Sequence, residues 1–421
     1  MLCLRHNLGP ACVAGFLLSA IVGSPAAQAA VPEASPEASR PWREAADELG
    51  RYHDELRAWR QEHGTQRALP AVSFFLFGMG DRKKLVYRDG KIFDARSKAV
   101  LRDFDVTEEL IVPSAFTVLL RTKAGLVRIV EDERGVSLFE GVRKTELTRA
   151  KVSLPRFSAH RFPRIMRVLL QEILINVVDG KPLPNFFVYD KPWYRDGAMM
   201  MMVLQRTHNG ALLSRWVKGL DTPFDRNNAN EEEADNPGQA LYLISHHGGR
   251  KHPLVGRLQA ALKRFETKAP DGTTFIQGRS DFASHPVYQT LWAKLGLTAL
   301  GLSDPYTVPA IDDNYALLFW WDGGKAITPK AHFSVAETLD YPYLTWAEDH
   351  HLGTARAPLG NRDYPLSWEA HASQAHYEGM SVIDPVYVKE KLATPHTWHA
   401  AEMFLLLDEA KALTNSNGKA Q

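Results

Sequence analysis

Apolar residues recur at regular intervals in the first part of the chain after residue 41. Two adjacent rows of apolar positions repeat every seven residues, one formed by Trp42, Leu49 and Leu56 and the other by Ala45, Tyr52 and Trp59. Such rows lie on one side of a helix, so the pattern predicts a single charged amphipathic helix over residues 42–63. Its apolar stripe is expected to dock on the body of the protein.

Residues 70–157 carry a different pattern. Short runs rich in Val, Ile, Leu and Phe alternate with turn sequences such as Asp89-Gly90, Ala124-Gly125 and Arg134-Gly135. Runs of this length joined by such turns are typical of β-hairpins. We therefore expect a small antiparallel β domain, and since no cluster of catalytic residue types stands out in it, a structural or interaction role is favoured.

From residue 158 onward the helical period dominates. Residues 164–178 are apolar on nearly all sides, as in a helix buried between others. Gly, Pro, Asn and Asp separate the later segments with a helical period. The prediction is a mainly α protein, in which helical hairpins close into an (α/α) toroid over residues 158–415, behind the β domain. The later helical segments are 199–204, 211–220, 237–247, 254–266, 286–300, 312–321, 334–348, 368–380 and 395–412.

The first 29 residues have the pattern of a secretory signal peptide. Arg5 precedes an apolar run, and Ala27-Gln28-Ala29 fits a peptidase site. The alternative is a membrane anchor, but the run is shorter than the roughly 20 residues that a span needs. Both cysteines, Cys3 and Cys12, lie inside this segment, so we expect neither disulfides nor thiolate catalysis after cleavage. Residues 30–41 are expected to be a disordered linker, and the protein to be periplasmic or secreted, without stable membrane insertion after signal cleavage.

Charge and motifs exclude several function classes. The 50 basic and 49 acidic side chains give a net charge of +1, so bulk electrostatics favours neither nucleic acid nor an anionic membrane as partner. The sixteen histidines form no tight ligand motif, and we expect no metal. The sequence has neither a Gly-x-Gly-x-x-Gly motif nor a phosphate loop, so no nucleotide cofactor is expected. It also lacks the Gly-x-Ser-x-Gly motif, so serine-hydrolase chemistry has no support.

An acidic loop precedes one predicted helix start. Glu231, Glu232 and Glu233 run toward Asp235, and Asn236 is a candidate N-cap followed by Pro237. The helix dipole favours a charged Asp235, whereas adjacent glutamates repel one another and raise the pKa of the most buried one. Two neighbouring carboxyl groups whose pKa values are shifted in opposite directions suit an acid and base pair. A solvated acidic loop without a catalytic role would have the same sequence.

A second cluster opens another predicted helix. Trp193 and Tyr194 place two rings beside Arg195 and Asp196. Arg and Asp together can bind vicinal hydroxyl groups while a ring stacks on the apolar face of a sugar. A buried structural ion pair is the competing interpretation.

Polar side chains also crowd the late part of the chain. Within residues 364–377, Trp368, Glu369, His371 and Gln374 are more polar than a core helix tolerates without partners. In the last predicted helix, Glu402 lies one turn after Trp398 on the same face. Both groups are candidates to line a substrate site.

These clusters resemble those of the six-hairpin (α/α)-toroid glycosidases, the group of glucoamylase-like and unsaturated-glucuronyl-hydrolase-like enzymes. The resemblance rests on Trp193-Tyr194-Arg195-Asp196-Gly197, on the acidic loop from Glu231 to Asp235, and on a closing helix of the Trp-x-x-Ala-Glu kind at residues 395–407. It implies that Arg195 and Asp196 line the sugar subsite at the cleavage point and that a glutamate of the loop protonates the leaving oxygen. It also implies a general base on a late helix, which points to Glu369 or Glu402.

The resulting hypothesis is an exported glycoside hydrolase with a carbohydrate substrate and no cofactor. Glu233 or Glu232 would be the general acid and Asp235 or Glu369 the general base, while the remaining clustered residues would bind substrate. Two alternatives stay open. One is a polysaccharide lyase using His246, His371, Tyr377 and Arg195, and the other is a non-catalytic glycan-binding or envelope-assembly protein.

Overall fold

The structure is a computed structural model that describes residues 40–62, 72–187, 189–227, 229–280, 283–311 and 397–417. The expected signal peptide and most of the linker lie outside these residues. The first element is helix α1 (Arg40–Glu62), which buries Tyr52, Leu56 and Trp59. The amphipathic helix predicted for residues 42–63 is therefore confirmed.

Helix α1 is fixed to helix α2 (Pro163–Ile175) by a cationic fork. The guanidinium of Arg164 binds Glu48 through Nε and Nη2, at 2.8 and 3.0 Å, and Glu55 through Nη1, at 2.7 Å. The backbone N–H of Arg164 also donates to Glu55. Two acids that lie about two helical turns apart on α1 thus meet one arginine at the start of α2, which sets the docking position of the amphipathic helix.

Nine strands between residues 74 and 149 form two antiparallel sheets, one with the order β1-β2-β3-β4 and one with the order β5-β6-β7-β8-β9. Neighbouring strands in each sheet are consecutive in the chain, so every connection within a sheet is a turn or loop of two to seven residues. At Asp89-Gly90 both residues have positive φ, as a two-residue hairpin requires. The antiparallel strands predicted for this part of the chain are present. Their bounds are Phe74–Phe77, Leu85–Arg88, Lys91–Asp94, Val100–Asp103, Val106–Val112, Thr117–Thr122, Gly125–Glu131, Gly135–Glu140 and Arg143–Arg149.

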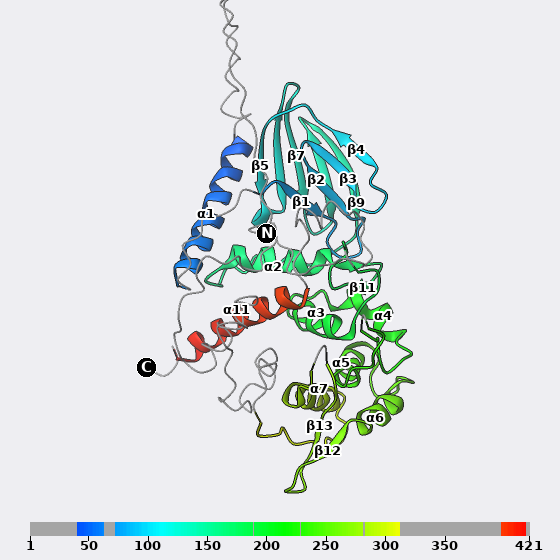
Figure 1. The fold of residues 1–421 in the computed structure, drawn as a ribbon. Coiled ribbons are helices and arrows are strands. Elements are labelled where there is room, and N and C mark those ends of the chain that lie inside the picture. Colours follow the sequence, from blue (N-terminus) through cyan, green and yellow to red (C-terminus); the bar gives the residue numbers. More distant parts are fainter. Residues whose placement is uncertain are drawn as a thin grey trace, which may run out of the picture. The chain divides into compact units, whose positions relative to one another are not determined.

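Helices follow the two sheets. Helix α11 (Thr397–Asn417) contacts α2 and α3 (Tyr194–Arg206), α3 contacts α5 (Asn236–His247), and α5 contacts α7 (Pro286–Ala299), as Figure 1 shows. None of the helices in the described ranges is long and apolar enough to cross a membrane. Shorter elements complete this part: 3-10 helices η1 (Pro113–Ala115) and η2 (Gly210–Leu213), helices α4 (Ser214–Lys218) and α6 (Val255–Lys263), and hairpins β10 (Val177–Val178) with β11 (Lys181–Pro182) and β12 (Glu266–Lys268) with β13 (Thr274–Ile276).

Helices α5 and α7 approach each other closely through two glycines. A Cβ added to Gly238 would lie 2.5 Å from the carbonyl carbon of Trp292, and a Cβ added to Gly296 would collide with the backbone oxygen of Gly238. This close approach holds the start of α5, where the acidic loop ends, against the middle of α7.

The predicted mainly α toroid is wrong, and with it the likeness to the toroid glycosidases as a statement of fold. The described residues form a mixed α/β structure with four antiparallel sheets, and two of these sheets, β10-β11 and β12-β13, lie inside the region expected to be helical hairpins. The run at residues 164–178 ends as a helix at Ile175 because Asp179-Gly180 turns the chain into a hairpin. The helices predicted within residues 312–380 fall outside the described residues.

Candidate functional site

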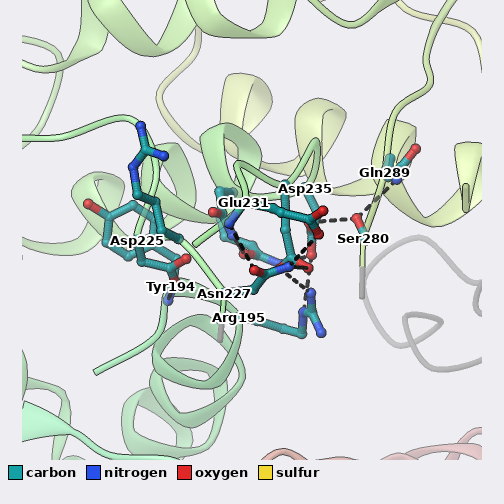
Figure 2. A network of polar contacts seen from close by, with 12 residues as sticks. Tyr194, Arg195, Asp225, Asn227, Glu231, Asp235, Ser280 and Gln289 are labelled. Atoms are coloured by element: carbon teal, nitrogen blue, oxygen red, sulfur yellow. Dashed lines mark hydrogen bonds and ion pairs between the residues drawn. The ribbon is translucent and has the colours of Figure 1, made fainter. Parts of the chain in front are cut away.

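A buried arginine joins helix α3 to the acidic loop. Arg195, in the first turn of α3, is 3% exposed, and its Nη2 lies 2.7 Å from Glu233 Oε2 while its Nε lies 3.1 Å from Asp235 Oδ2. Figure 2 shows this guanidinium pointing at the carboxylates of the loop. Two carboxylates separated by one residue in sequence therefore bind a single delocalised cation, away from water.

Protein donors surround the carboxylate of Asp235. Ser280 Oγ donates to Oδ1 at 2.6 Å, and Gln239 Nε2 donates to Oδ2 at 2.7 Å, in addition to Arg195. Gln289, on α7, in turn donates to the Ser280 hydroxyl at 2.9 Å, as Figure 2 shows. With three donors on two oxygens, this carboxylate is held in one orientation and positions Arg195.

The start of α5 differs slightly from its prediction. Asp235 occupies the N-cap position in place of Asn236, which is the first helical residue, and Pro237 follows it. Asn236 donates to Gln239 at 3.2 Å. The capping residues are thus used within the buried network, and Gln239 reaches back to the side chain of Asp235.

The three consecutive glutamates occupy different environments. Glu231 pairs with Arg279 at 2.9 Å, and Glu232 pairs with Arg226 and Arg264 at the surface. Glu233 alone turns inward, where it is 3% exposed. The structure therefore distinguishes the two candidate acids of the loop: Glu232 is a solvated ion pair, and Glu233 belongs to the buried network.

Asn227 organises the loop from within. Its side-chain oxygen accepts the backbone N–H groups of Ala229 and Glu231, each at 2.9 Å, and its amide donates to Glu233 Oε1 at 3.2 Å. An amide that binds both the backbone and the inward carboxylate fixes where Glu233 points.

Helix α11 reaches the same network from the far end of the chain. The Thr397 hydroxyl donates to Asp196 Oδ1 at 3.1 Å, and the guanidinium carbon of Arg195 lies 5.1 Å from the ring centre of Trp398. The ring of Tyr288 stacks near Trp398, at 6.3 Å and 22°. Asp196, Arg195 and Trp398, which the sequence places in separate clusters, are therefore neighbours.

Glu402 is the most unusual carboxyl group of the site. It is 4% exposed, Trp398 Nε1 donates to its Oε1 at 2.5 Å, and its buried Oε2 has no hydrogen-bond partner among the described residues. Burial raises the pKa of Glu402 well above its usual range, and the hydrogen bond from Trp398 offsets only part of this effect. The group is expected to hold its proton under conditions in which exposed glutamates are ionised.

Asp225 is a second carboxyl group with a displaced pKa. It is partly exposed by area, yet the protein atoms around the carboxyl raise its pKa to about 7, and the nearby charges of Asp235 and Asp196 act in the same direction. The backbone N–H of Tyr194, at the start of α3, donates to it and opposes the shift, as does Arg195. Desolvation therefore outweighs the helix N-terminus here.

The two rings at the start of α3 differ in exposure. Tyr194 is buried, and its hydroxyl donates to the Thr222 carbonyl at 2.7 Å. Trp193 is partly exposed and lies edge to face with Tyr189 at 5.1 Å. Trp193 is thus the ring of the pair that solvent can reach, and Tyr194 is held by packing.

Several predicted site residues are not brought to this network. Trp368, Glu369, His371, Gln374 and Tyr377 lie outside the described residues. His246 is ten residues after Asn236 on the same helix, about 15 Å along its axis at 1.5 Å per residue. Burial lowers the pKa of His246, with a further contribution from His247. In the described part of the chain no group of three His, Cys, Asp or Glu side chains has the arrangement of a metal site.

Some members of the network could not be predicted from the sequence. Ser280, Gln289, Thr397 and Tyr288 are ordinary residues in their local context and become neighbours of Asp235, Asp196 or Trp398 only through tertiary contacts. Asn227 lies in the acidic loop, where a density of short amides was the only signal.

No family model matches the chain, and neither a curated protein nor a solved structure is significantly similar to it.

Proposed function

We propose that the protein is a glycoside hydrolase in which Glu402 is the general acid and Glu233 the general base. The observation that carries the proposal is the contrast between the two carboxyl groups. Glu402 is desolvated and has a raised pKa, whereas Glu233 lies 2.7 Å from the fixed positive charge of Arg195. Pairs of carboxyl groups in opposed environments are what acid–base hydrolysis of a glycosidic bond requires.

Each group has a defined part in the reaction. The Glu402 hydroxyl would give its proton to the glycosidic oxygen as the carbon–oxygen bond breaks, and the Glu233 carboxylate would take a proton from the water that attacks the anomeric carbon. Glu402 ends ionised and Glu233 protonated, and exchange with solvent restores both. This assignment moves the acid from the loop, where the sequence placed it, to α11, because Glu402 is the carboxyl group with the raised pKa.

The neighbouring residues support these roles. Asp235 is saturated by Arg195, Gln239 and Ser280, so it suits a positioning residue better than a base that must bind water. Trp398 contacts both Arg195 and Glu402. The partly exposed ring of Trp193, two residues before Arg195, is the candidate stacking surface for a sugar. Both proposed catalytic carboxyl groups are nearly buried, so the proposal requires an opening motion before a glycan reaches them.

The alternatives differ in their support. A lyase would need a base such as His246 near Arg195, and α5 separates it from the network by about 15 Å. A non-catalytic glycan-binding protein would use the same rings and amides. Glu402→Gln distinguishes the two: in a glycan-binding protein the substitution should leave binding intact, whereas in a hydrolase it should abolish most of the hydrolysis.

The test is a hydrolysis screen of the full chain against a panel of oligo- and polysaccharides, scored for new reducing ends and for ultraviolet-absorbing unsaturated products. We expect reducing ends without unsaturation. Glu402→Gln and Glu233→Gln should each lower the rate by about 100-fold or more, a typical loss for an acid–base group. Glu232→Gln, a neighbour in the same loop with surface partners, is the matched control and should stay near wild type.

Three outcomes would refute the proposal. They are unsaturated products, a Glu402→Gln variant as active as wild type, and a wild-type protein that binds a glycan and never cleaves it. Circular dichroism and thermal unfolding of each variant separate loss of catalysis from loss of fold.

A further inference from the structure

A cleft of about 710 Å³ lies apart from the network around Arg195. Its walls come from the loop after β1, the turn after β7, the segment after β9, the β10-β11 turn, and residues 208–215 around η2 and α4. No residue of this cleft belongs to the proposed acid–base site. Its volume is within the range of small-molecule sites, about 300–1,000 Å³.

Hydrogen bonds between distant segments fix the walls of the cleft. Asp81 accepts the backbone N–H of Gly180 at 2.6 Å, which joins the loop after β1 to the β10-β11 turn. Asn209, which is buried, accepts the N–H of Ser153 at 2.8 Å and donates to its carbonyl at 2.9 Å. The segments that line the cleft are therefore held together before any ligand arrives.

The loop that carries Asp81 is also anchored from inside the protein. The neighbouring Arg82 makes a fully buried ion pair with Glu131 at 2.7 Å, and Gly80 donates its N–H to the carbonyl of Leu174 in α2 at 2.8 Å. Buried partners on both sides of Asp81 make this wall rigid.

The charged residues of the cleft divide into two groups. Each carboxylate already has a donor in the protein: Asp81 has Gly180, Glu133 accepts the Leu154 N–H at 3.4 Å, and Asp179 pairs with Arg96 at 3.1 Å. Only Asp179 is paired with a cation among the described residues, so Asp81 and Glu133, which each accept one backbone N–H, can still accept hydrogen bonds from hydroxyl groups of a ligand.

The basic side chains of the cleft are exposed, and they have no such partners among the described residues. The side chains of Lys151, His208 and Arg215 make no hydrogen bond and no ion pair with the described residues, although all three line the same cleft. Arg215 and Lys151 line the same cleft, and an oxyanion can accept hydrogen bonds from both the guanidinium and the ammonium group.

We propose that this cleft binds a small hydroxylated ligand that carries an oxyanion, either a carboxylate or a phosphate. Arg215 and Lys151 bind the oxyanion, and the side chains of Asp81 and Glu133 accept from the hydroxyl groups. The site does not depend on the proposed hydrolase activity, so either proposal can fail without the other.

The test is calorimetric titration of the full chain with gluconate, glucose 6-phosphate and, as the neutral comparison, glucose. We expect at least one of the two anions to bind and glucose not to bind measurably. Arg215→Gln and Lys151→Gln should each weaken that binding by about tenfold, because a hydrogen bond to a charged group is lost. Lys218→Gln changes an exposed cation at the end of the same helix α4 that does not line the cleft, and it should leave the affinity unchanged.

The titrations distinguish the source of the oxyanion and the failure of the idea. Binding of gluconate alone identifies a carboxylate ligand, and binding of glucose 6-phosphate alone a phosphate ligand. If neither anion binds more tightly than glucose, or if Lys218→Gln weakens binding as much as Arg215→Gln, the cleft is not an oxyanion site.

Discussion

Replacing Glu402 with glutamine tests the protonation state on which the proposed function rests. The glutamine has nearly the same shape, and its side-chain oxygen can still accept from Trp398. It cannot ionise, so the folded protein no longer contains a carboxyl group whose charged form is opposed by burial. The variant is therefore expected to fold, and its stability relative to wild type should depend on pH.

Proton linkage determines whether the wild type gains or loses stability relative to Glu402→Gln as the pH rises. The folded pKa of Glu402 is raised above the unfolded value, so between those two values the folded state holds a proton that the unfolded state has lost. The associated stability is complete below the unfolded pKa and is lost as the pH rises through the folded pKa. Across that window the wild type should lose about 1.4 kcal/mol of unfolding free energy per pH unit relative to Glu402→Gln.

The assay is urea unfolding of both proteins at several pH values from about 5 to about 8, with the unfolding free energy extrapolated to water. Because all other titrating groups are shared, the difference between the two proteins isolates Glu402. Glu232→Gln serves as the control, since that glutamate pairs with surface arginines at the edge of the loop and its removal should give no such slope. A constant difference between wild type and Glu402→Gln across the whole range would show that Glu402 is ionised when folded and would remove the general acid.

Three further substitutions test other parts of the structure. Asp225→Asn should gain stability relative to wild type as the pH rises from about 4 toward about 7 and then stay level, because the pKa of Asp225 is raised to about 7, and the same urea series measures it. Arg195→Met should lower the unfolding free energy by about 3–5 kcal/mol, because two buried carboxylates lose their cation; a loss below about 1 kcal/mol in urea unfolding would contradict the buried ion pairs. Gly238→Ala should destabilise by about 1–3 kcal/mol or more in thermal unfolding, because the new Cβ would lie 2.5 Å from the backbone of α7, whereas the exposed Gly256→Ala control in α6 should be neutral or stabilising.

Local patterns predicted the elements better than the architecture. The apolar rows of α1 and the turn at Asp89-Gly90 are short-range signals, and both are present in the structure. The same two-residue turn occurs at Asp179-Gly180, where both residues have positive φ, yet the apolar Val177-Val178 before it was assigned to the preceding helix. The turn sequence Asp179-Gly180 therefore indicates a hairpin within the region predicted to be a toroid. The helical period of the preceding apolar run led to a helix prediction instead.

Strands β3 and β4 have only weak signals in the sequence. Lys91–Asp94 alternates partly and fully buried residues, and Val100–Asp103 is largely exposed, so neither has the apolar run that marks a buried strand. Strand β3 pairs with β2, and β4 pairs with β3, so backbone hydrogen bonds hold both strands in the sheet. Whether such segments form strands depends on their pairing with neighbouring strands, which a single sequence does not show.

The site shows the same division between local and long-range information. The local sequence identified Glu231, Glu232 and Glu233 as candidate acids, but it does not show which of them is buried. The ranking depends on Arg279 and Arg264, which lie far along the chain and bind the first two at the surface, while Arg195 binds the third inside. The spacing of Trp398 and Glu402 is local, and their contact with Arg195 is not.

The buried network around Arg195 is difficult to explain by stability alone. Burial of one cation and two carboxylates costs solvation free energy, and well-packed apolar residues of similar volume commonly give equal or greater stability. Glu402 adds a further buried ionisable group whose Oε2 has no partner among the described residues. Four ionisable side chains in one buried network, each retained against that cost, are expected where the charges themselves do chemistry. Under the proposed function, Arg195 accounts for the burial of Glu233 because it binds the carboxylate that acts as the general base, and Trp398 contacts both Arg195 and the general acid Glu402.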